Sequence, residues 1–393
     1  MDLNDTPSMA EIRAEARAFL ADAWPAWKRE HAITGEPPYA LAAMRAWQRT
    51  LAEHGWGAPL WPPEVGGRGF GPVELAVWSQ EKAKVAANVP FNIVGFGMAG
   101  PTIVTHGSAE QKERYLPPLL RGDELWCQLF SEPGAGSDLA GLSTRAERDG
   151  DDWIVTGQKV WSSGAHEADF GILLARHDPS VPKHQGLTYF ICDMRAPGVE
   201  VRPLKQLSGE AHFSEVFLEN VRIPDAGRIG EPGEGWTVAR TTLLYERMSL
   251  GDVTAGITFP FDKLVAIARQ HDRLDPVARQ DLVGVYTTER LLEQLNNRIL
   301  SKLGRGEIPT AEGSVVKLML AELGTRAANL GLRLLGPQGA VRGDDGPQQA
   351  FLWEKAMHLG GGTDEIQRNQ IAERVLGLPR DPQPDRDQPF RDA

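Results

Sequence analysis

The chain has 393 residues, of which 41% are hydrophobic, and a formal net charge of −11 at pH 7. This length fits two or three packed units, and the apolar fraction excludes wholesale disorder. The acidic balance argues against a nucleic-acid partner, because phosphate contacts need a concentrated basic surface. Only two cysteines occur, Cys127 and Cys192, which indicates a reduced, cytoplasmic protein without a zinc site. We expect neither a signal peptide nor a membrane span.

Apolar residues at helical spacing open the chain. They cover Ala10–Ala23 and Tyr39–His54, stop at the Pro- and Gly-rich stretch Pro59–Gly67, and resume from Pro72 to about Arg121. The pattern predicts an N-terminal helical domain over residues 1–124.

The period changes near Leu125. Short runs of β-branched and aromatic residues follow, separated by Gly, Pro and Asp, as in an antiparallel β unit. These runs are Trp153–Thr156, Phe170–Leu174, Leu187–Ile191, Val199–Val201 and Glu215–Leu218. They predict a central β domain over residues 125–235.

The helical period returns after Gly235 and holds to about Val375, with a loop at Gly336–Gly346. It predicts a C-terminal helical bundle over residues 236–378. The last residues, 379–393, are rich in Pro, Asp and Arg, and we expect a flexible tail there. The predicted fold class is therefore α+β, with helices, a β middle and helices again.

One candidate ligand-binding loop lies at Gln128–Asp138, which reads Gln-Leu-Phe-Ser-Glu-Pro-Gly-Ala-Gly-Ser-Asp. Its glycines permit tight turns and close approach of backbone amides to an anion. Ser131 and Ser137 add hydroxyl donors. An ordinary surface turn has the same composition, so both interpretations stay open.

A second candidate stretch is Gly157–His166, Gly-Gln-Lys-Val-Trp-Ser-Ser-Gly-Ala-His. Trp161 suits a flat wall beside a ring-shaped cofactor, and the alternative is a tryptophan that fills the β core. His166 and His358 are interpreted as packed or solvated histidines, because lone histidines more often serve those roles than catalysis.

Three stretches together resemble the signatures of the acyl-CoA dehydrogenase family. They are Ser131–Asp138, Gly157–Gly164 and Gly362–Arg368, the last reading Gly-Thr-Asp-Glu-Ile-Gln-Arg. Their order and spacing are similar to those of the family, and the helix–β–helix pattern covers nearly the whole chain. The resemblance implies an FAD-dependent dehydrogenase that converts an acyl-CoA thioester to a trans-2-enoyl-CoA. It also implies an electron-transfer flavoprotein as acceptor, and a homodimer, homotetramer or mixed tetramer.

The resemblance also assigns residues to the cofactor. Phe130 and Ser131 would contact the flavin ring, while Trp161 and Ser163 would stack on it and hydrogen-bond to it. Ser137 would lie near the cofactor phosphates or the CoA. The full set of expected FAD-binding residues is Gln128, Phe130, Ser131, Ser137, Trp161, Ser163, Arg269, Gly336, Thr363 and Glu365.

Departures from the family pattern concern the adenine half of FAD. The Arg-x-x-Phe-Gly pattern that begins at Arg269 is broken by Asp272 and Arg273, and Arg333 replaces a glutamine usual before the Gly336 loop. They motivate an alternative, a weakly active or structural FAD-sharing subunit beside a catalytic sister. A further alternative is a flavin monooxygenase or oxidase, because one fold supports several functions.

Desaturation of a thioester needs a carboxylate that removes the α-proton while a hydride leaves the β-carbon for N5 of the flavin. Many family members keep this carboxylate immediately before the late Gly-Thr, where this chain has Gly361. Enzymes similar to isovaleryl- and long-chain acyl-CoA dehydrogenases place it in the first long helix of the C-terminal domain, before an arginine. This chain has Glu246-Arg247 there.

Helical spacing favours Glu246 independently of the resemblance. The residues Ala239, Leu243, Glu246, Leu250 and Val253 are spaced 4, 3, 4 and 3 apart, which places the carboxylate in an apolar stripe. Desolvation there would make it a stronger base. The alternative is a glutamate at the edge of the stripe that reaches solvent or pairs with an arginine. The expected substrate-binding residues are Ser137, Arg247, Gly361 and Gly362, the glycines through amides that polarise the thioester oxygen.

Overall fold

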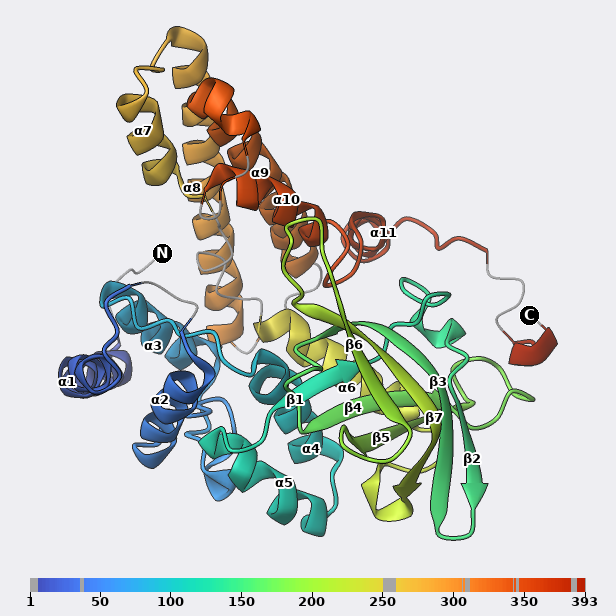
Figure 1. Cartoon of the computed structure of the whole chain (residues 1–393). Coiled ribbons are helices and arrows are strands. Elements are labelled where there is room, and N and C mark those ends of the chain that lie inside the picture. The colour runs from blue at the N-terminus through green and yellow to red at the C-terminus, as the bar shows by residue number, and fades with distance from the viewer. Residues whose placement is uncertain are drawn as a thin grey trace. The chain divides into compact units, whose positions relative to one another are not determined.

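The computed structural model describes residues 6–35, 39–249, 259–305, 307, 312–341, 343, 346–382 and 387–392. Tertiary contacts divide the chain into two compact units (Figure 1). The first unit comprises Met1–Leu204, Ala211–Glu246 and Gln383–Ala393, and the second comprises Lys205–Glu210 and Arg247–Pro382. The N-terminal helices and the β-sheet thus share one unit, and the expected domain boundaries at 124, 235 and 378 stay a prediction.

Among the described residues, the first unit begins with five α-helices, α1 (Pro7–Glu30), α2 (Leu41–Glu53), α3 (Pro72–Lys84), α4 (Gly100–His106) and α5 (Ala109–Arg121). Thr6 and Ser108 cap α1 and α5 by accepting hydrogen bonds from backbone amides of the first turn. The predicted N-terminal helices are confirmed. An aromatic core fills the space among α1, α2 and α3, and its tryptophans are Trp24, Trp27, Trp47, Trp56 and Trp78.

The sheet of the first unit has eight strands, β1 (Trp126–Leu129), β2 (Arg145–Asp149), β3 (Asp152–Ser163), β4 (Phe170–Arg176), β5 (Leu187–Asp193), β6 (Val199–Leu204), β7 (Phe213–Pro224) and β8 (Arg228–Ile229). Their order is β6-β7-β3-β2-β4-β5-β8, with β1 paired to β4. All five predicted runs are strands. The pairing is antiparallel except that β1 and β2 each run parallel to β4.

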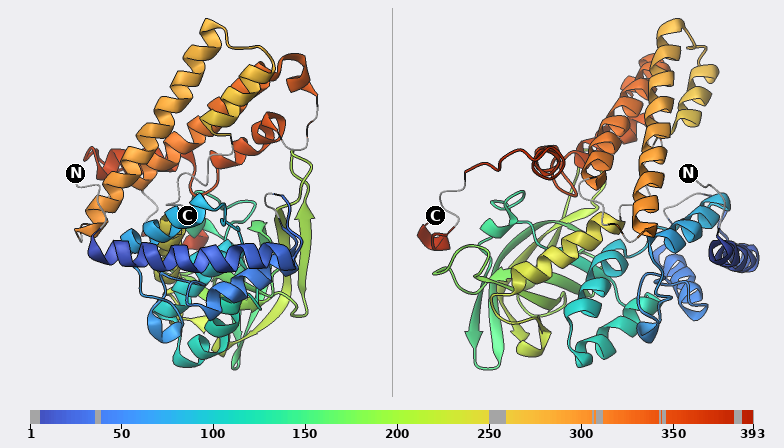
Figure 2. Two further views of the ribbon diagram at one scale, coloured as in Figure 1. Left: turned by 90° about the vertical axis from the view of Figure 1, so that its left-hand side faces the viewer. Right: turned by 180° about the vertical axis from the view of Figure 1, so that it is seen from behind.

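Strands β4 and β5 are buried on both faces, because alternate side chains enter two different cores. Leu174 and Tyr189 face a core shared with α4, α5 and α6, whereas Leu173 and Phe190 face a core formed within the sheet. Figure 2 shows α6 (Gly235–Ser249), in yellow, lying across the helix-covered face of the sheet. This packing explains why the runs in β4 and β5 are continuously apolar.

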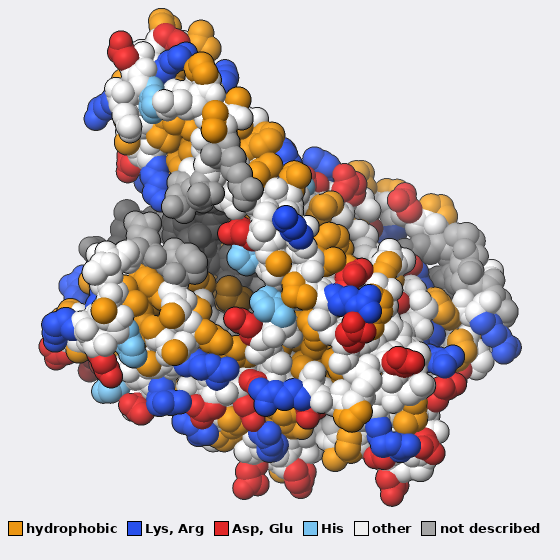
Figure 3. Space-filling model, viewed as in Figure 1, with side chains coloured by type: hydrophobic (Ala, Val, Ile, Leu, Met, Phe, Trp, Pro, Cys, Tyr) orange, Lys and Arg blue, Asp and Glu red, His pale blue; other side chains and the backbone are white. Residues whose placement is uncertain are grey.

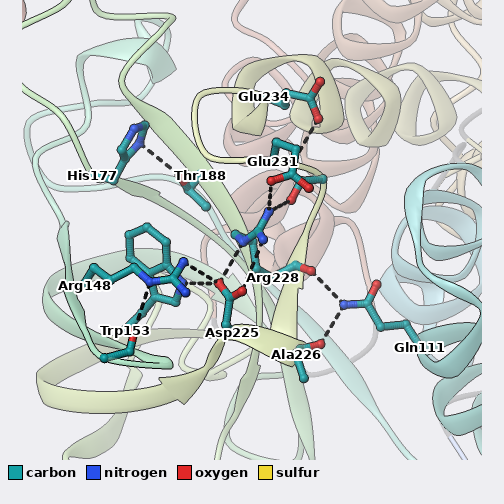
Figure 4. A network of polar contacts seen from close by, with 12 residues as sticks. Gln111, Arg148, Trp153, His177, Thr188, Asp225, Ala226, Arg228, Glu231 and Glu234 are labelled. Carbon is teal, nitrogen blue, oxygen red and sulfur yellow. Dashed lines mark hydrogen bonds and ion pairs between the residues drawn. The ribbon is translucent and has the colours of Figure 1, made fainter.

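A polar network joins the β7–β8 corner to α5 (Figure 4). Asp225 Oδ1 accepts hydrogen bonds from Trp153 Nε1 over 2.7 Å and from Arg228 Nε over 2.9 Å. Gln111 Nε2 donates to the carbonyl oxygens of Ala226 and Arg228 over 2.8 and 2.7 Å. The hydrogen bonds from Arg228 and Trp153 lower the pKa of Asp225 to about 2. The hydrogen bonds of Asp225, Arg228 and Gln111 therefore fix the corner that leads into α6.

The second unit is helical, with α7 (Phe261–Gln270), α8 (Pro276–Gly304), α9 (Glu312–Leu335), α10 (Pro347–Met357) and α11 (Asp364–Arg374). Helices α7, α8 and α9 share an apolar core that includes Leu264, Leu282 and Leu323. The predicted C-terminal helices are confirmed. Within the described residues, no helix is long and apolar enough to cross a bilayer.

The last described segment, residues 387–392, packs against the β domain. The Phe390 amide donates to the Val181 carbonyl over 3.0 Å, and the Arg391 amide donates to the Pro179 carbonyl over 3.1 Å. The guanidinium carbon of Arg176 lies 3.5 Å from the centroid of the Phe390 ring. These contacts hold residues 387–392 against the β domain, because an aromatic side chain covers the flat face of a buried arginine. The expected flexible tail over residues 379–393 stays a prediction.

Candidate active site

The end of β1 and the irregular end of β3 lie side by side in the first unit. The Val160 amide donates to the Ser131 carbonyl over 2.9 Å, and the register of β3 on β7 shifts between Lys159 and Ser162. At this shift Trp161 adopts a left-handed φ of 62°, and the residue is 61% exposed. The alternative of a core-filling tryptophan is therefore wrong. The indole stands where a flat ligand can stack on it.

A buried ion pair, Lys159–Glu132, lies next to the ends of β1 and β3. The sequence patterns did not predict it. Lys159 Nζ donates to Glu132 Oε1 over 2.8 Å and to the carbonyl oxygens of Phe130 and Leu174 over 3.0 and 2.8 Å. Burial by itself would raise the pKa of Glu132, but the Lys159 charge and further hydrogen bonds lower it to about 2. The ionised pair anchors the two signature stretches to each other.

The glycine-rich loop after β1 is a tight turn with an open outer side. Glu132 and Ala135 exchange two backbone hydrogen bonds of 3.0 and 3.1 Å. A Cβ atom added to Gly134 or Gly136 would meet no atom within 4 Å. Ser137 is exposed just beyond the turn. Exposed amides and a hydroxyl beside open space suit an anionic ligand.

An unpartnered buried amide lies next to this loop. The alternation of side chains along β1 places Gln128 on the same face as Phe130. Among the described residues none hydrogen-bonds to Gln128 Nε2, although the atom is buried. A buried donor without an acceptor costs about 1–3 kcal/mol. The acceptor atoms of a flavin ring would satisfy it, so the residues of this edge fit FAD. Ser163 is exposed at the end of β3.

Glu246 continues the buried face of α6. Ala239 and Thr242 are 0% exposed and three residues apart, and Glu246 follows four residues later, half-buried. The buried face is rotated from the predicted stripe, because Thr242 rather than Leu243 is fully buried. The rest of the predicted stripe and its neighbour lie outside the described residues: the Arg247 side chain, Leu250 and Val253.

The late Gly-Thr turn precedes α11 in the second unit. Gly361 and Gly362 have φ values of 65° and 86°, which glycine adopts without the steric cost that other residues bear. Gln367 Nε2 donates to the Gly361 carbonyl over 2.8 Å, and the Thr363 hydroxyl caps α11. Glu365 is exposed. The turn is therefore held in one conformation by its own helix.

His358 supports the same turn. Its Nδ1 lies 2.6 Å from Asp364 Oδ2 and its Nε2 lies 2.9 Å from Thr325 Oγ1, while Lys317 donates to Asp364 Oδ1 over 2.8 Å. Burial would raise the pKa of Asp364, but the hydrogen bonds from His358 and Lys317 lower it. His358 is thus a packed, hydrogen-bonded histidine, as the sequence analysis predicted.

The residues expected near the adenine half of FAD lie in the second unit. Arg269 is exposed near the end of α7. Arg333 forms an ion pair with Asp281. Gly336 has a φ of 64°, and a Cβ atom added there would lie 2.6 Å from Arg273 Nη2. Within this unit, Arg333 thus pairs with Asp281, and the Arg273 side chain lies against Gly336.

Charged side chains of both signs are interspersed over the face drawn in Figure 3. A surface pocket of about 480 Å³ in the first unit is also lined by side chains of both charges. They are Arg45, Arg114, Arg195, Asp123 and Asp193. Such mixed charge does not form the basic surface that a nucleic acid requires.

Family models match most of the chain. The N-terminal domain of acyl-CoA dehydrogenases matches residues 6–123, the middle domain matches residues 127–221, and the C-terminal domain matches residues 233–376. The chain belongs to the acyl-CoA dehydrogenase family. Acyl-CoA dehydrogenases are FAD-dependent oxidoreductases of lipid degradation, so the predicted family, fold class and enzyme class are confirmed.

Similar acyl-CoA dehydrogenases come from Mycobacterium tuberculosis. FadE34 is 43% identical over 337 residues, which are 85% of this chain but 46% of FadE34, so the chain spans about half the length of that relative. IpdE1 is 37% identical, with 94% of this chain and 98% of IpdE1 covered.

Solved acyl-CoA dehydrogenase structures share the fold over the same extent. The steroid ACAD Tcur3481-Tcur3483 is 31% identical, covers 97% of this chain and 100% of its own, and has a TM-score of 0.79. The ChsE4-ChsE5 complex from Mycobacterium tuberculosis is 29% identical, with the same coverage and a TM-score of 0.77.

Proposed function

We propose that the protein binds FAD and removes hydrogen from the α- and β-carbons of an acyl-CoA thioester, giving a trans-2-enoyl-CoA. The observation that carries this proposal is the position of Glu246. It continues the buried face of α6, within the same unit as Trp161 and the Ser131 loop. The other base position of the family holds Gly361, which has no proton-accepting side chain.

In this proposal the Glu246 carboxylate accepts the α-proton as the general base. The backbone amides of Gly361 and Gly362 donate to the thioester oxygen and stabilise the charge that develops there. Bound FAD supplies the acceptor for the hydride that leaves the β-carbon. Trp161 and Ser163 hold the ring, and Gln128 contributes the amide donor that has no partner among the described residues.

The remaining expected contacts complete the binding site. Phe130 and Ser131 border the ring, and Ser137 lies toward the phosphates of FAD or CoA. Arg247 orients the substrate. The family resemblance implies further FAD contacts from Arg269, Gly336, Thr363 and Glu365.

We infer a bulky, ring-bearing acyl group as the substrate. A relative at 31% identity is described as a steroid ACAD, and it matches this chain over 97% of its length. An electron-transfer flavoprotein is the proposed acceptor, and a cytoplasmic location stays a prediction.

Anaerobic titration of the purified protein with a panel of acyl-CoA thioesters tests the proposal. The protein should be yellow, and ring-bearing thioesters should bleach it more readily than short straight-chain ones. Glu246→Gln should keep the flavin and bind the thioester but lose flavin reduction by about 10²–10⁴-fold, because the base is gone. Glu219→Gln, an exposed carboxylate on β7, is the matched control. Near-normal reduction of Glu246→Gln contradicts the assignment.

Returning a carboxylate to the vacated turn is a second test. Gly361→Glu in the Glu246→Gln background should recover part of the flavin reduction if both positions serve one site. The recovery should be partial, since the left-handed φ of 65° strains any residue with a Cβ atom. Single-turnover reduction rates of the single and double variants measure it.

A second candidate is an FAD-sharing subunit of a mixed oligomer. Two similar structures are described by pairs of protein names, Tcur3481-Tcur3483 and ChsE4-ChsE5, and the second is a complex. In that case the chain purified alone is colourless and becomes yellow with its sister subunit. Rapid reoxidation of the reduced flavin by air would instead favour an oxidase or monooxygenase.

A further inference from the structure

Three buried hydroxyl groups meet where α6 crosses the sheet. Tyr189 Oη lies 2.9 Å from Thr242 Oγ1, and Thr102 Oγ1 lies 2.8 Å from the same atom. All three residues are 0% exposed. Tyr189 belongs to β5, Thr242 to α6 and Thr102 to α4. This hydroxyl trio therefore joins three separate elements of the first unit at one oxygen atom.

The direction of each hydrogen bond follows from the number of protons. Thr242 Oγ1 also lies 3.2 Å from the Val238 carbonyl oxygen, which can only accept. Thr242 has one hydroxyl proton, so when it donates that proton to Val238, both Tyr189 and Thr102 donate to Thr242. Burial raises the pKa of Tyr189, so its hydroxyl keeps the proton that it donates. In this arrangement each hydroxyl of the trio donates one hydrogen bond.

The trio connects the two halves of the proposed site in this unit. Thr242 lies one helical turn before Glu246, so a rotation of α6 about its axis moves both side chains together. The Tyr189 ring packs edge-on against Phe130, with centroids 5.8 Å apart and an interplanar angle of 90°. Phe130 directly precedes Ser131 in the loop proposed to border the flavin.

We propose that Thr242 and Tyr189 are positioning residues that fix the rotation of α6, and thereby the direction of the Glu246 carboxylate relative to the flavin-binding loop. This inference rests on the proposed function. Apolar contacts between a helix and a sheet are non-directional, whereas hydrogen bonds weaken steeply when they are bent. A small rotation of α6 is therefore tolerated by its apolar neighbours but breaks the trio.

The decisive variant is Thr242→Val, which keeps the side-chain shape and removes the hydroxyl. Flavin reduction at saturating acyl-CoA should slow about 10- to 100-fold, because a misplaced catalytic group loses that much rate. The bound FAD and the thioester concentration at half-saturation should stay nearly unchanged. Thr242→Ser should restore the rate, and Tyr189→Phe should slow it less than Thr242→Val. The matched control is Thr237→Val, the same change at an exposed position of the same helix.

The proposal that the trio positions α6 is overturned if the flavin is reduced at the wild-type rate in both Thr242→Val and Tyr189→Phe. If Thr242→Val does not fold, Tyr189→Phe decides the question, with slower reduction in support and wild-type reduction against. A loss of rate in Thr237→Val equal to that in Thr242→Val also overturns it, because the effect would then not depend on the trio.

Amide hydrogen exchange over residues 239–246 separates this inference from the proposed function. Faster exchange in Thr242→Val than in Thr237→Val supports the fixing of α6 by the trio, and equal exchange overturns it. This readout needs no substrate. If wild-type protein is reduced by no acyl-CoA, or if Glu246→Gln is reduced normally, the proposed function fails while exchange still decides whether the trio fixes the helix.

Discussion

Lys159 is fully buried and donates three hydrogen bonds inside the β domain, one of them to Glu132. An unpaired charge at such a position would cost several kcal/mol, so the lysine requires its carboxylate. The sequence could have predicted the burial of Lys159, because alternate side chains of a strand share a face and Lys159 shares one with Trp153 and Val155. Its partner could not be read, since Glu132 is 27 positions away in the chain.

Removal of the ammonium group should expose the role of this pair. Lys159→Met leaves the Glu132 charge buried without its partner and should lower the free energy of unfolding by about 3–5 kcal/mol. Lys183→Met breaks the exposed Lys183–Asp138 pair and should cost at most about 1 kcal/mol. Chemical denaturation of both variants measures the difference. Equal losses would show that burial of the pair does not matter.

The same pair should make stability depend on acid. The pKa of Glu132 is lowered from 4.5 to about 2, so its contribution is fully present above pH 4.5 and is lost as the pH falls toward 2. Wild-type protein should therefore exceed Glu132→Gln in free energy of unfolding at neutral pH. The gap should shrink through that acid range. A gap that stays constant with pH would contradict this account.

At the scale of elements, α6 shows both the strength and the limit of pattern analysis. Helical spacing predicted the helix and the burial of Ala239 correctly, while the inward direction of Glu246 stays a prediction. The predicted stripe included Leu243 and left out Thr242, because threonine is a polar residue. Thr242 is buried instead, since Tyr189 and Thr102 supply partners from distant parts of the chain.

The C-terminal segment is a second element whose state depended on a distant partner. Phe390→Ala removes the ring from Arg176 and should weaken the docking of residues 387–392 by about 0.5–2 kcal/mol. Hydrogen exchange of that segment should then become faster. Gln388→Ala, an exposed neighbour, should leave the exchange unchanged. Unchanged exchange in Phe390→Ala would mean that the backbone hydrogen bonds alone hold the segment.

At the scale of the whole molecule, α8 exposes several large apolar side chains, which are Val277, Val283, Tyr286 and Leu291. Exposed apolar surface of this kind favours association with another subunit. Val283→Asp should therefore shift the protein toward smaller species in sedimentation or light-scattering measurements. The shift should appear in a homo-oligomer and in a mixed oligomer alike, whereas an unchanged mass would exclude the exposed side chain of Val283 from an interface.

The sequence by itself determined the order of elements, the family and the candidate residues, because these depend on local period and on short motifs such as Ser131–Asp138. Tertiary structure decided whether each side chain is buried or exposed. It exposed Trp161 at an irregular strand end, buried Thr242 among hydroxyl partners and paired Lys159 with Glu132. Each of these outcomes depends on groups far apart in the chain, and local patterns carry no information about which distant group supplies the partner.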